Sequence, residues 1–154
     1  MSVETFQALV VPVADAIAGQ PVEPALAALL NDRFPPAGPA FQAIEQACHA
    51  AIAEGWMCAH GPANARYGRV IKPSPATAQL SVDVVDLTDI AGPHHLHPKG
   101  EICMIMPIDA GAQFDGHGIG WSVYPPGSGH RPTVSGGRAL VLYLLPDGKI
   151  EFTK

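Results

Sequence analysis

The apolar residues in the first third of the chain recur at the spacing of an amphipathic helix. Positions i, i+3, i+4 and i+7 share one face of a helix. Five apolar residues before Gly19 follow this spacing: Phe6, Leu9, Val10, Val13 and Ile17. Ser2 is a favoured N-cap residue and Gly19 a favoured stop. Pro12 lies inside the pattern, and because it lacks a backbone N–H we expect it to kink or split this first helix.

Two more helices are predicted before residue 56. Pro24 suits the first position of a helix that ends before Pro35-Pro36. A third helix is predicted from Phe41 to Glu54, with Gly55 as its stop. We see no catalytic pattern in these segments. We therefore expect residues 1–55 to form a helical extension that covers the rest of a single domain or takes part in a homodimer.

From Trp56 onward the apolar pattern changes to short alternating or β-branched segments, which are typical of strands. Asp147-Gly148 near the end of the chain predicts a tight hairpin turn. Short strands at this spacing are typical of a sandwich or barrel, so residues 56–154 predict a mainly β fold. The strands are expected at 67–71, 80–87, 101–107, 112–114, 120–124, 133–134, 138–145 and 149–152.

Composition narrows the class of protein. With 154 residues, 47% hydrophobic and only 15% charged, the chain is long and apolar enough for one folded domain. A net charge of −5 argues against binding to nucleic acid or to an anionic membrane. Three cysteines without paired spacing, no basic leader and no long apolar run predict a soluble cytoplasmic protein.

Histidines and one glutamate form the candidate chemistry. His95 and His97 occupy positions i and i+2, so on a strand their side chains point to the same face. Pro98-Lys99-Gly100 predicts a turn, after which Glu101 begins the next strand and can reach the same space. His130 follows the turn-rich segment 125–129. Three imidazoles and a carboxylate suit Fe(II), Mn(II), Ni(II), Co(II) or Zn(II), although exposed loop histidines are an alternative.

The same residues carry a resemblance to a known fold family. Residues 92–101, Gly-Pro-His-His-Leu-His-Pro-Lys-Gly-Glu, resemble the first cupin motif, and residues 120–130 resemble the second. The resemblance implies a small antiparallel β-barrel with one divalent transition metal inside, held by His95, His97, Glu101 and His130.

Other residues are candidates for binding a substrate. Arg66 and Arg69 stand three apart on a predicted strand, so at most one should face the interior, where a guanidinium suits a carboxylate. Trp121 and Tyr124 could wall an aromatic pocket or be core residues. Cys103 should face inward with Glu101. His117 is either an acid–base group or an exposed loop residue.

The whole layout is similar to that of the bacterial 4-hydroxylaminobenzoate lyase family. The similarity includes Glu54-Gly55-Trp56, the Arg66/Arg69 pair, both histidine segments and the final Leu-Leu-Pro-x-Gly-x-Ile. It implies a lyase that converts a small aromatic carboxylate, 4-hydroxylaminobenzoate, to 3,4-dihydroxybenzoate and ammonia. Our hypothesis is that the metal acts as a Lewis acid in this reaction, with Glu101 and His130 as catalytic residues and Arg69 or Arg66 holding the carboxylate. An Fe(II) dioxygenase and a cupin that binds or senses a small acid remain alternatives.

Overall fold

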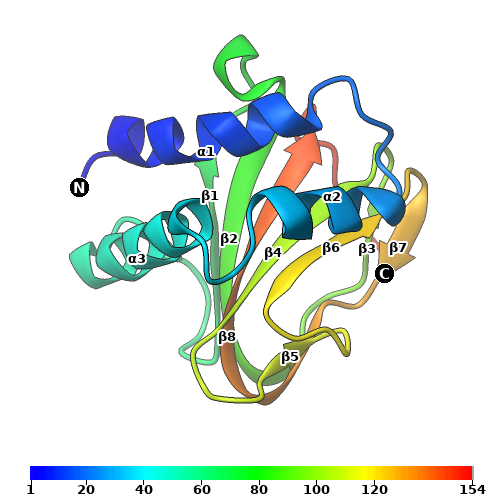
Figure 1. Cartoon of the computed structure of the whole chain (residues 1–154). Coiled ribbons are helices and arrows are strands. Elements are labelled where there is room, and N and C mark those ends of the chain that lie inside the picture. Colours follow the sequence, from blue (N-terminus) through cyan, green and yellow to red (C-terminus); the bar gives the residue numbers. More distant parts are fainter. Residues whose placement is uncertain (154) are drawn as a thin grey trace.

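The computed structural model describes residues 1–153, in which three α-helices precede two antiparallel sheets (Figure 1). Ser2 caps the first helix by accepting a hydrogen bond from the backbone N–H of Thr5, and Gly55 ends the third with φ 89°. None of the described helices combines the length and apolarity that crossing a membrane requires. The helices are α1 (Val3–Ile17), α2 (Ala25–Arg33) and α3 (Pro39–Glu54), and a 3₁₀ turn, η1, spans Pro75–Thr77.

The larger sheet has the strand order β1-β2-β8-β4-β6, with β5 paired to β8, and the smaller sheet has the order β7-β3-β9. The two sheets do not join into a closed ring, but their arrangement is that of a jelly-roll. The mainly β, antiparallel fold with helices first is therefore confirmed. The strands are β1 (Ala65–Ile71), β2 (Leu80–Ala91), β3 (His95–His97), β4 (Glu101–Pro107), β5 (Gln113–Phe114), β6 (Gly120–Tyr124), β7 (Ser128–His130), β8 (Thr133–Pro146) and β9 (Glu151–Phe152).

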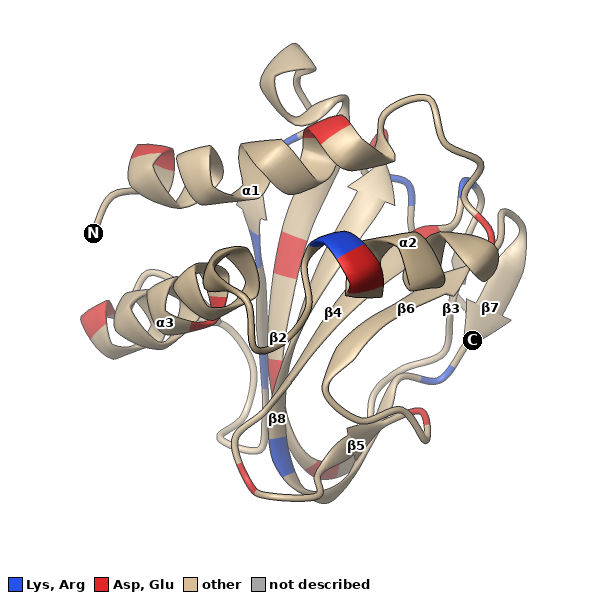
Figure 2. Ribbon diagram, in the orientation of Figure 1, with Lys and Arg blue, Asp and Glu red and all other residues tan. Residues whose placement is uncertain are grey.

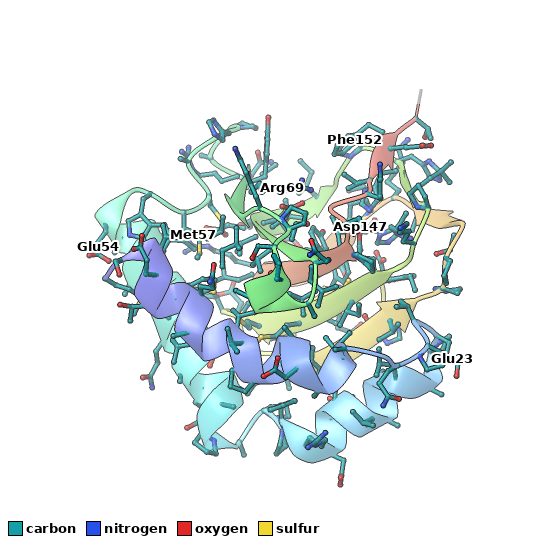
Figure 3. All side chains as sticks on the ribbon, turned by 90° about the horizontal axis from the view of Figure 1, so that it is seen from above. Glu23, Glu54, Met57, Arg69, Asp147 and Phe152 are labelled. Atoms are coloured by element: carbon teal, nitrogen blue, oxygen red, sulfur yellow. The ribbon has the colours of Figure 1, made fainter. Side chains whose placement is uncertain are left out.

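The three helices pack on one face of the larger sheet. Alternate residues of β2, β4 and β8, such as Val82, Met104 and Leu142, join helix residues in one buried cluster. The intervening residues, such as Cys103 and Tyr143, belong to a second cluster on the opposite face of the sheet. Viewed from above, Figure 3 shows Arg69, Asp147 and Phe152 away from the helices. The face of the larger sheet that is turned away from the helices, here called the inner face, is therefore available for a site.

Three local features differ from the sequence-based expectations. Pro12 does not split α1, which runs through it. The two strands expected at 133–134 and 138–145 form one strand, β8, because Gly136 and Gly137 adopt φ values of 77° and 125° and let pairing with β2 continue. Asp147-Gly148 does form a turn with positive φ at both residues. The strand after it, however, pairs with β3 of the other sheet, so the expected hairpin is wrong.

Charged side chains are sparse along the ribbon. In Figure 2 the Lys and Arg positions are scattered and form no basic patch in that view, in keeping with the net charge of −5.

Candidate metal centre and cavity

Three strands bring the candidate ligands together. His95 and His97 lie on β3 with their side chains on one face, and the turn at residues 98–100 returns the chain so that Glu101 begins β4. His130 ends β7, where it pairs directly with His95 in the antiparallel ladder. Local strand geometry and one cross-strand register thus account for all four positions.

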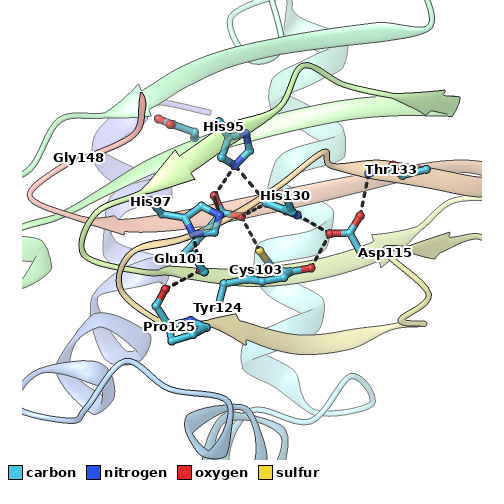
Figure 4. Close-up of polar contacts among 12 residues, drawn as sticks. His95, His97, Glu101, Cys103, Asp115, Tyr124, Pro125, His130, Thr133 and Gly148 are labelled. Atoms are coloured by element: carbon cyan, nitrogen blue, oxygen red, sulfur yellow. Dashed lines mark hydrogen bonds and ion pairs between the residues drawn. The ribbon is translucent and has the colours of Figure 1, made fainter. Parts of the chain in front are cut away.

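The four side chains converge on one buried point (Figure 4). His95 Nε2 lies 3.0 Å from Glu101 Oε2 and 3.1 Å from His130 Nε2. His130 Nε2 lies 3.2 Å from Glu101 Oε1, and His97 Nε2 lies 3.6 Å from Glu101 Oε2. Ligands bound to one ion at about 2.1 Å and at right angles to each other are about 3 Å apart, so these separations suit a shared metal.

The hydrogen bonding of the histidines also fits a metal. His97 Nε2 is buried and has no hydrogen-bond partner among residues 1–153. Its other ring nitrogen, Nδ1, is 2.9 Å from Ser128 Oγ, and His130 Nδ1 is 2.5 Å from Asp115 Oδ2. Metal-binding histidines use one nitrogen for the ion and the other for such a partner. The residues present therefore fit a divalent transition metal bound through inward-facing Nε2 atoms.

The ionisation states of Glu101 and His97 favour the binding of a cation. Burial opposes ionisation of Glu101, but hydrogen bonds with His130 and His95 outweigh it and lower the pKa to about 2. Burial lowers the pKa of His97 to about 4, so its ring is in the neutral form that metals bind. Burial would also lower the pKa of His130, but hydrogen bonds to Asp115 and Glu101 raise it to about 9.

Asp115 is a site residue that sequence reasoning missed. Its Oδ2 accepts hydrogen bonds from His130 Nδ1 and from the Tyr124 hydroxyl, and its Oδ1 accepts one from the backbone N–H of Thr133. These bonds lower the pKa of Asp115 against the opposing effect of burial. The residue stands in an Asp-Gly turn with a φ of 49°, and by itself this pattern indicates only a loop.

Cys103 and Tyr124 border the cluster, and Cys103 lies on the inward face that the sequence predicted for it. Cys103 is buried, and its Sγ donates a hydrogen bond to Glu101 Oε1 at 3.2 Å. Burial raises the pKa of this thiol well above its usual range, so it stays protonated. The ring of Tyr124 lies 4.3 Å from that of His130, centroid to centroid. His117, in the same loop as Asp115, is exposed.

A cavity of about 720 Å³ lies beside the metal centre, between the two sheets. His95 belongs to its wall, so the cavity reaches the candidate ligands. Arg69 and Asp83 line it from β1 and β2, and Tyr67 and Phe152 line its opening, where both rings are largely exposed. The remaining wall is largely proline, glycine and aliphatic, which suits an aromatic ring.

The other sequence-predicted substrate residues lie elsewhere. Arg66 donates hydrogen bonds to the carbonyl oxygens of Cys58 and Gly61 and does not line the cavity. Trp121 is buried in the cluster between sheet and helices, and its Nε1 donates to the carbonyl of Phe34. Of the four candidates, Arg69 lines the cavity and Tyr124 contacts the histidines.

Comparison with known proteins gives a consistent family. The model of the 4-hydroxylaminobenzoate lyase family (PnbB) matches residues 8–152. A 4-hydroxylaminobenzoate lyase from Pseudomonas putida is 30% identical over 141 residues, which cover 80% of each chain. One from Nocardioides sp. (strain LMS-CY) is 29% identical over 133 residues, covering 80% of this chain and 78% of that one.

Solved structures resemble the chain only distantly. A protein of unknown function with a cupin-like fold from Ralstonia eutropha JMP134 matches with a TM-score of 0.38 and 14% identity, over 53% of this chain and 55% of that one.

Proposed function

The chain belongs to the 4-hydroxylaminobenzoate lyase family, and from this premise we propose that it is a metal-dependent lyase acting on 4-hydroxylaminobenzoate. The observation that carries the proposal is the family match over residues 8–152. The convergence of His95, His97, Glu101 and His130 supports the metal dependence. The apolar cavity beside them supports a small aromatic substrate.

The overall reaction consumes one water. The N–O bond breaks with both electrons moving to oxygen, which takes up a proton and leaves as water. The electron-deficient nitrogen then draws electrons from the ring and forms a C=N bond, while one water adds to the neighbouring ring carbon and releases a proton. A second water hydrolyses the C=N bond, so that oxygen replaces nitrogen, and the ring carbon that took up the first water loses its hydrogen as a proton, which restores the aromatic ring. The products are 3,4-dihydroxybenzoate and ammonia, and no external oxidant or reductant is needed.

His95, His97, Glu101 and His130 would hold a divalent transition metal, which supplies a Lewis acid for the departing oxygen and lowers the pKa of a bound water. We propose catalytic roles for Glu101 and His130, whose neighbours hold both side chains in orientation. Cys103 donates to Glu101, and Asp115 accepts from His130. The burial of the cluster excludes bulk water from the reacting groups.

Arg69 is the proposed partner of the substrate carboxylate. Asp83 accepts hydrogen bonds from its Nε and Nη2, at 2.7 and 3.2 Å, and the carbonyl of Gly148 accepts a further one from Nη2. These contacts hold the guanidinium at the cavity wall. Its Nη1 makes no hydrogen bond to the residues described, so that N–H group remains for a ligand.

The test is metal-dependent turnover by the purified protein. We expect near-stoichiometric divalent metal by mass spectrometry, and formation of 3,4-dihydroxybenzoate and ammonia that stops with a chelator and returns with metal. His97→Ala should lose the metal and at least about 100-fold in kcat/KM, because one ligand is gone. His94→Ala is the matched control, since His94 bonds Thr153 outside the cluster.

Three results would contradict the proposal. A requirement for O₂ would indicate a dioxygenase. Tight reversible binding of the acid without turnover would indicate a binding or sensing protein. Full activity of the metal-free protein would remove the metal from the mechanism.

A further inference from the structure

A row of side chains crosses the inner face of the larger sheet. Residues paired across antiparallel strands point to the same side. The register pairs Arg69 with Asp83, Asp83 with Tyr143, Tyr143 with Cys103 and Cys103 with Ser122. The row therefore runs from the proposed carboxylate partner, through Cys103 on the strand that carries Glu101, to Ser122 on β6.

Tyr143 in this row has a hydroxyl without a partner. The residue is 4% exposed and its hydroxyl oxygen is buried, yet it makes no hydrogen bond within the described part of the chain. Buried polar groups are almost always paired, so an unpaired one at a cavity points to a ligand. Tyr143 lines the cavity. Ser122, whose hydroxyl is also unpaired, does not line it.

The ring of Tyr143 is held next to the metal centre. Its centroid lies 6.4 Å from that of His95 and 6.0 Å from that of Phe114. Burial and the nearby charge of Glu101 raise the pKa of Tyr143 well above its usual range, so the hydroxyl keeps its proton and can donate.

The row also gives the substrate a direction. Arg69 lies two strands from Tyr143, a distance of roughly 10 Å at about 4.8 Å per strand. This separation is comparable to the length of a benzoate with a substituent opposite the carboxylate. With the carboxylate at Arg69, that substituent reaches the end of the cavity where His95 and Tyr143 lie.

We infer that Tyr143 is a substrate-binding residue whose hydroxyl donates a hydrogen bond to the N–O oxygen of the arylhydroxylamine. The inference rests on the proposed function for the identity of the substrate. The Tyr143 hydroxyl is a neutral hydrogen-bond donor to the oxygen that leaves as water. This oxygen lies at the opposite end of the substrate from the carboxylate. The donor holds this oxygen toward the metal centre while the N–O bond breaks.

Binding of two unreactive ligands tests this role on the metal-loaded protein. 4-(Hydroxymethyl)benzoate has an oxygen where the substrate has its N–O oxygen, and 4-ethylbenzoate has a methyl group there. By calorimetry, Tyr143→Phe should weaken binding of the hydroxymethyl compound about three- to tenfold, the effect of one neutral hydrogen bond. Binding of 4-ethylbenzoate should change less than about twofold, because no hydrogen bond is lost there.

Ser122→Ala is the matched control, because it also removes an unpaired buried hydroxyl from the row but not from the cavity wall. It should bind both ligands as the wild type does. Metal content and thermal stability of Tyr143→Phe should equal or exceed those of the wild type, since the hydroxyl bonds no described residue. Its kcat/KM for 4-hydroxylaminobenzoate should fall at least about tenfold.

Equal effects of Tyr143→Phe on the two ligands, no effect on either, or failure of the wild type to bind them would overturn the inference. A wild type that binds both ligands with the expected difference but does not turn over 4-hydroxylaminobenzoate would contradict the proposed function alone. Turnover by the wild type with unchanged kcat/KM in Tyr143→Phe would contradict the inference alone.

Discussion

Asp115 shows how one residue outside the proposed ligand set can orient a member of that set. It bonds His130 Nδ1 and leaves Nε2 directed at the other ligands. A carboxylate in this position fixes the orientation of the ring and makes the imidazole a stronger ligand. Metal affinity should therefore depend on Asp115 although its oxygens are not among the ligand atoms.

Asp115→Asn is expected to weaken metal binding about 10- to 100-fold, because the amide carries no negative charge to pair with His130. Competition with a chromophoric chelator measures this directly, without an activity assay. His117→Asn is the matched control, since His117 lies in the same loop and is exposed. Unchanged affinity in Asp115→Asn would show that His130 needs no such partner.

At this scale, sequence reasoning found residues whose placement follows from local geometry. Strand alternation and a short turn were enough to group His95, His97 and Glu101, and a second motif supplied His130. Asp115 and Tyr143 were missed because tertiary contacts alone define their roles. An Asp-Gly turn does not indicate which strand it approaches, and one tyrosine in an apolar strand looks like core.

The turn between β3 and β4 positions Glu101 in the proposed metal centre. Gly100 has φ 91°, and a Cβ there would lie 2.5 Å from Val22 Cγ1 and 2.8 Å from the carbonyl oxygen of Tyr124. The turn thus packs against both the segment after α1 and the end of β6. A side chain at residue 100 would displace Glu101, the next residue.

We expect Gly100→Ala to destabilise the protein by about 2–3 kcal/mol, of which about 1 kcal/mol comes from the positive φ and the rest from the contacts. Metal affinity should fall as well. Gly111→Ala is the control, because Gly111 has φ 84° with nothing near its Cβ position. Urea denaturation measures both variants, and equal losses would show that the contacts at residue 100 cost nothing.

Sequence patterns predicted elements better than the connections between them. The helices were identified by apolar periodicity and by caps such as Ser2 and Gly55, both of which act locally. The sequence did not predict that β8 continues through Gly136-Gly137, because paired glycines usually indicate a break between strands. The crossing of β9 to the smaller sheet was also missed, since a turn pattern does not determine which strand the chain pairs with next.

Across the whole molecule, one core joins the helices to the sheet. Phe6, Phe41 and Leu30 from the helices are fully buried in the same cluster as Val82 and Leu142 from the strands. Without the helices, the outer face of the sheet would expose these apolar residues to water. The helical part is thus expected to be required for folding of the sheets. A homodimer and a cytoplasmic location stay predictions from the sequence.

We expect the full chain to unfold in a single cooperative transition. Circular dichroism, which reports on the helices, and tryptophan fluorescence should give the same transition midpoint. A variant that begins at Trp56 should show no cooperative transition and should bind a dye specific for exposed apolar surface. Two separate transitions in the full chain, or a folded truncated variant, would show instead that the sheets are stable alone.

The alternation of faces along the central strands has an evolutionary consequence. Neighbouring residues of β8, such as Leu142 and Tyr143, serve the helix-facing core and the cavity respectively. Substitutions on the two faces share few partners, and distant, independent changes are close to additive. Changes in the cavity wall therefore leave the helix-facing core in place, so gene duplication followed by substitution in this wall can yield new specificities without first rebuilding the stability of the scaffold.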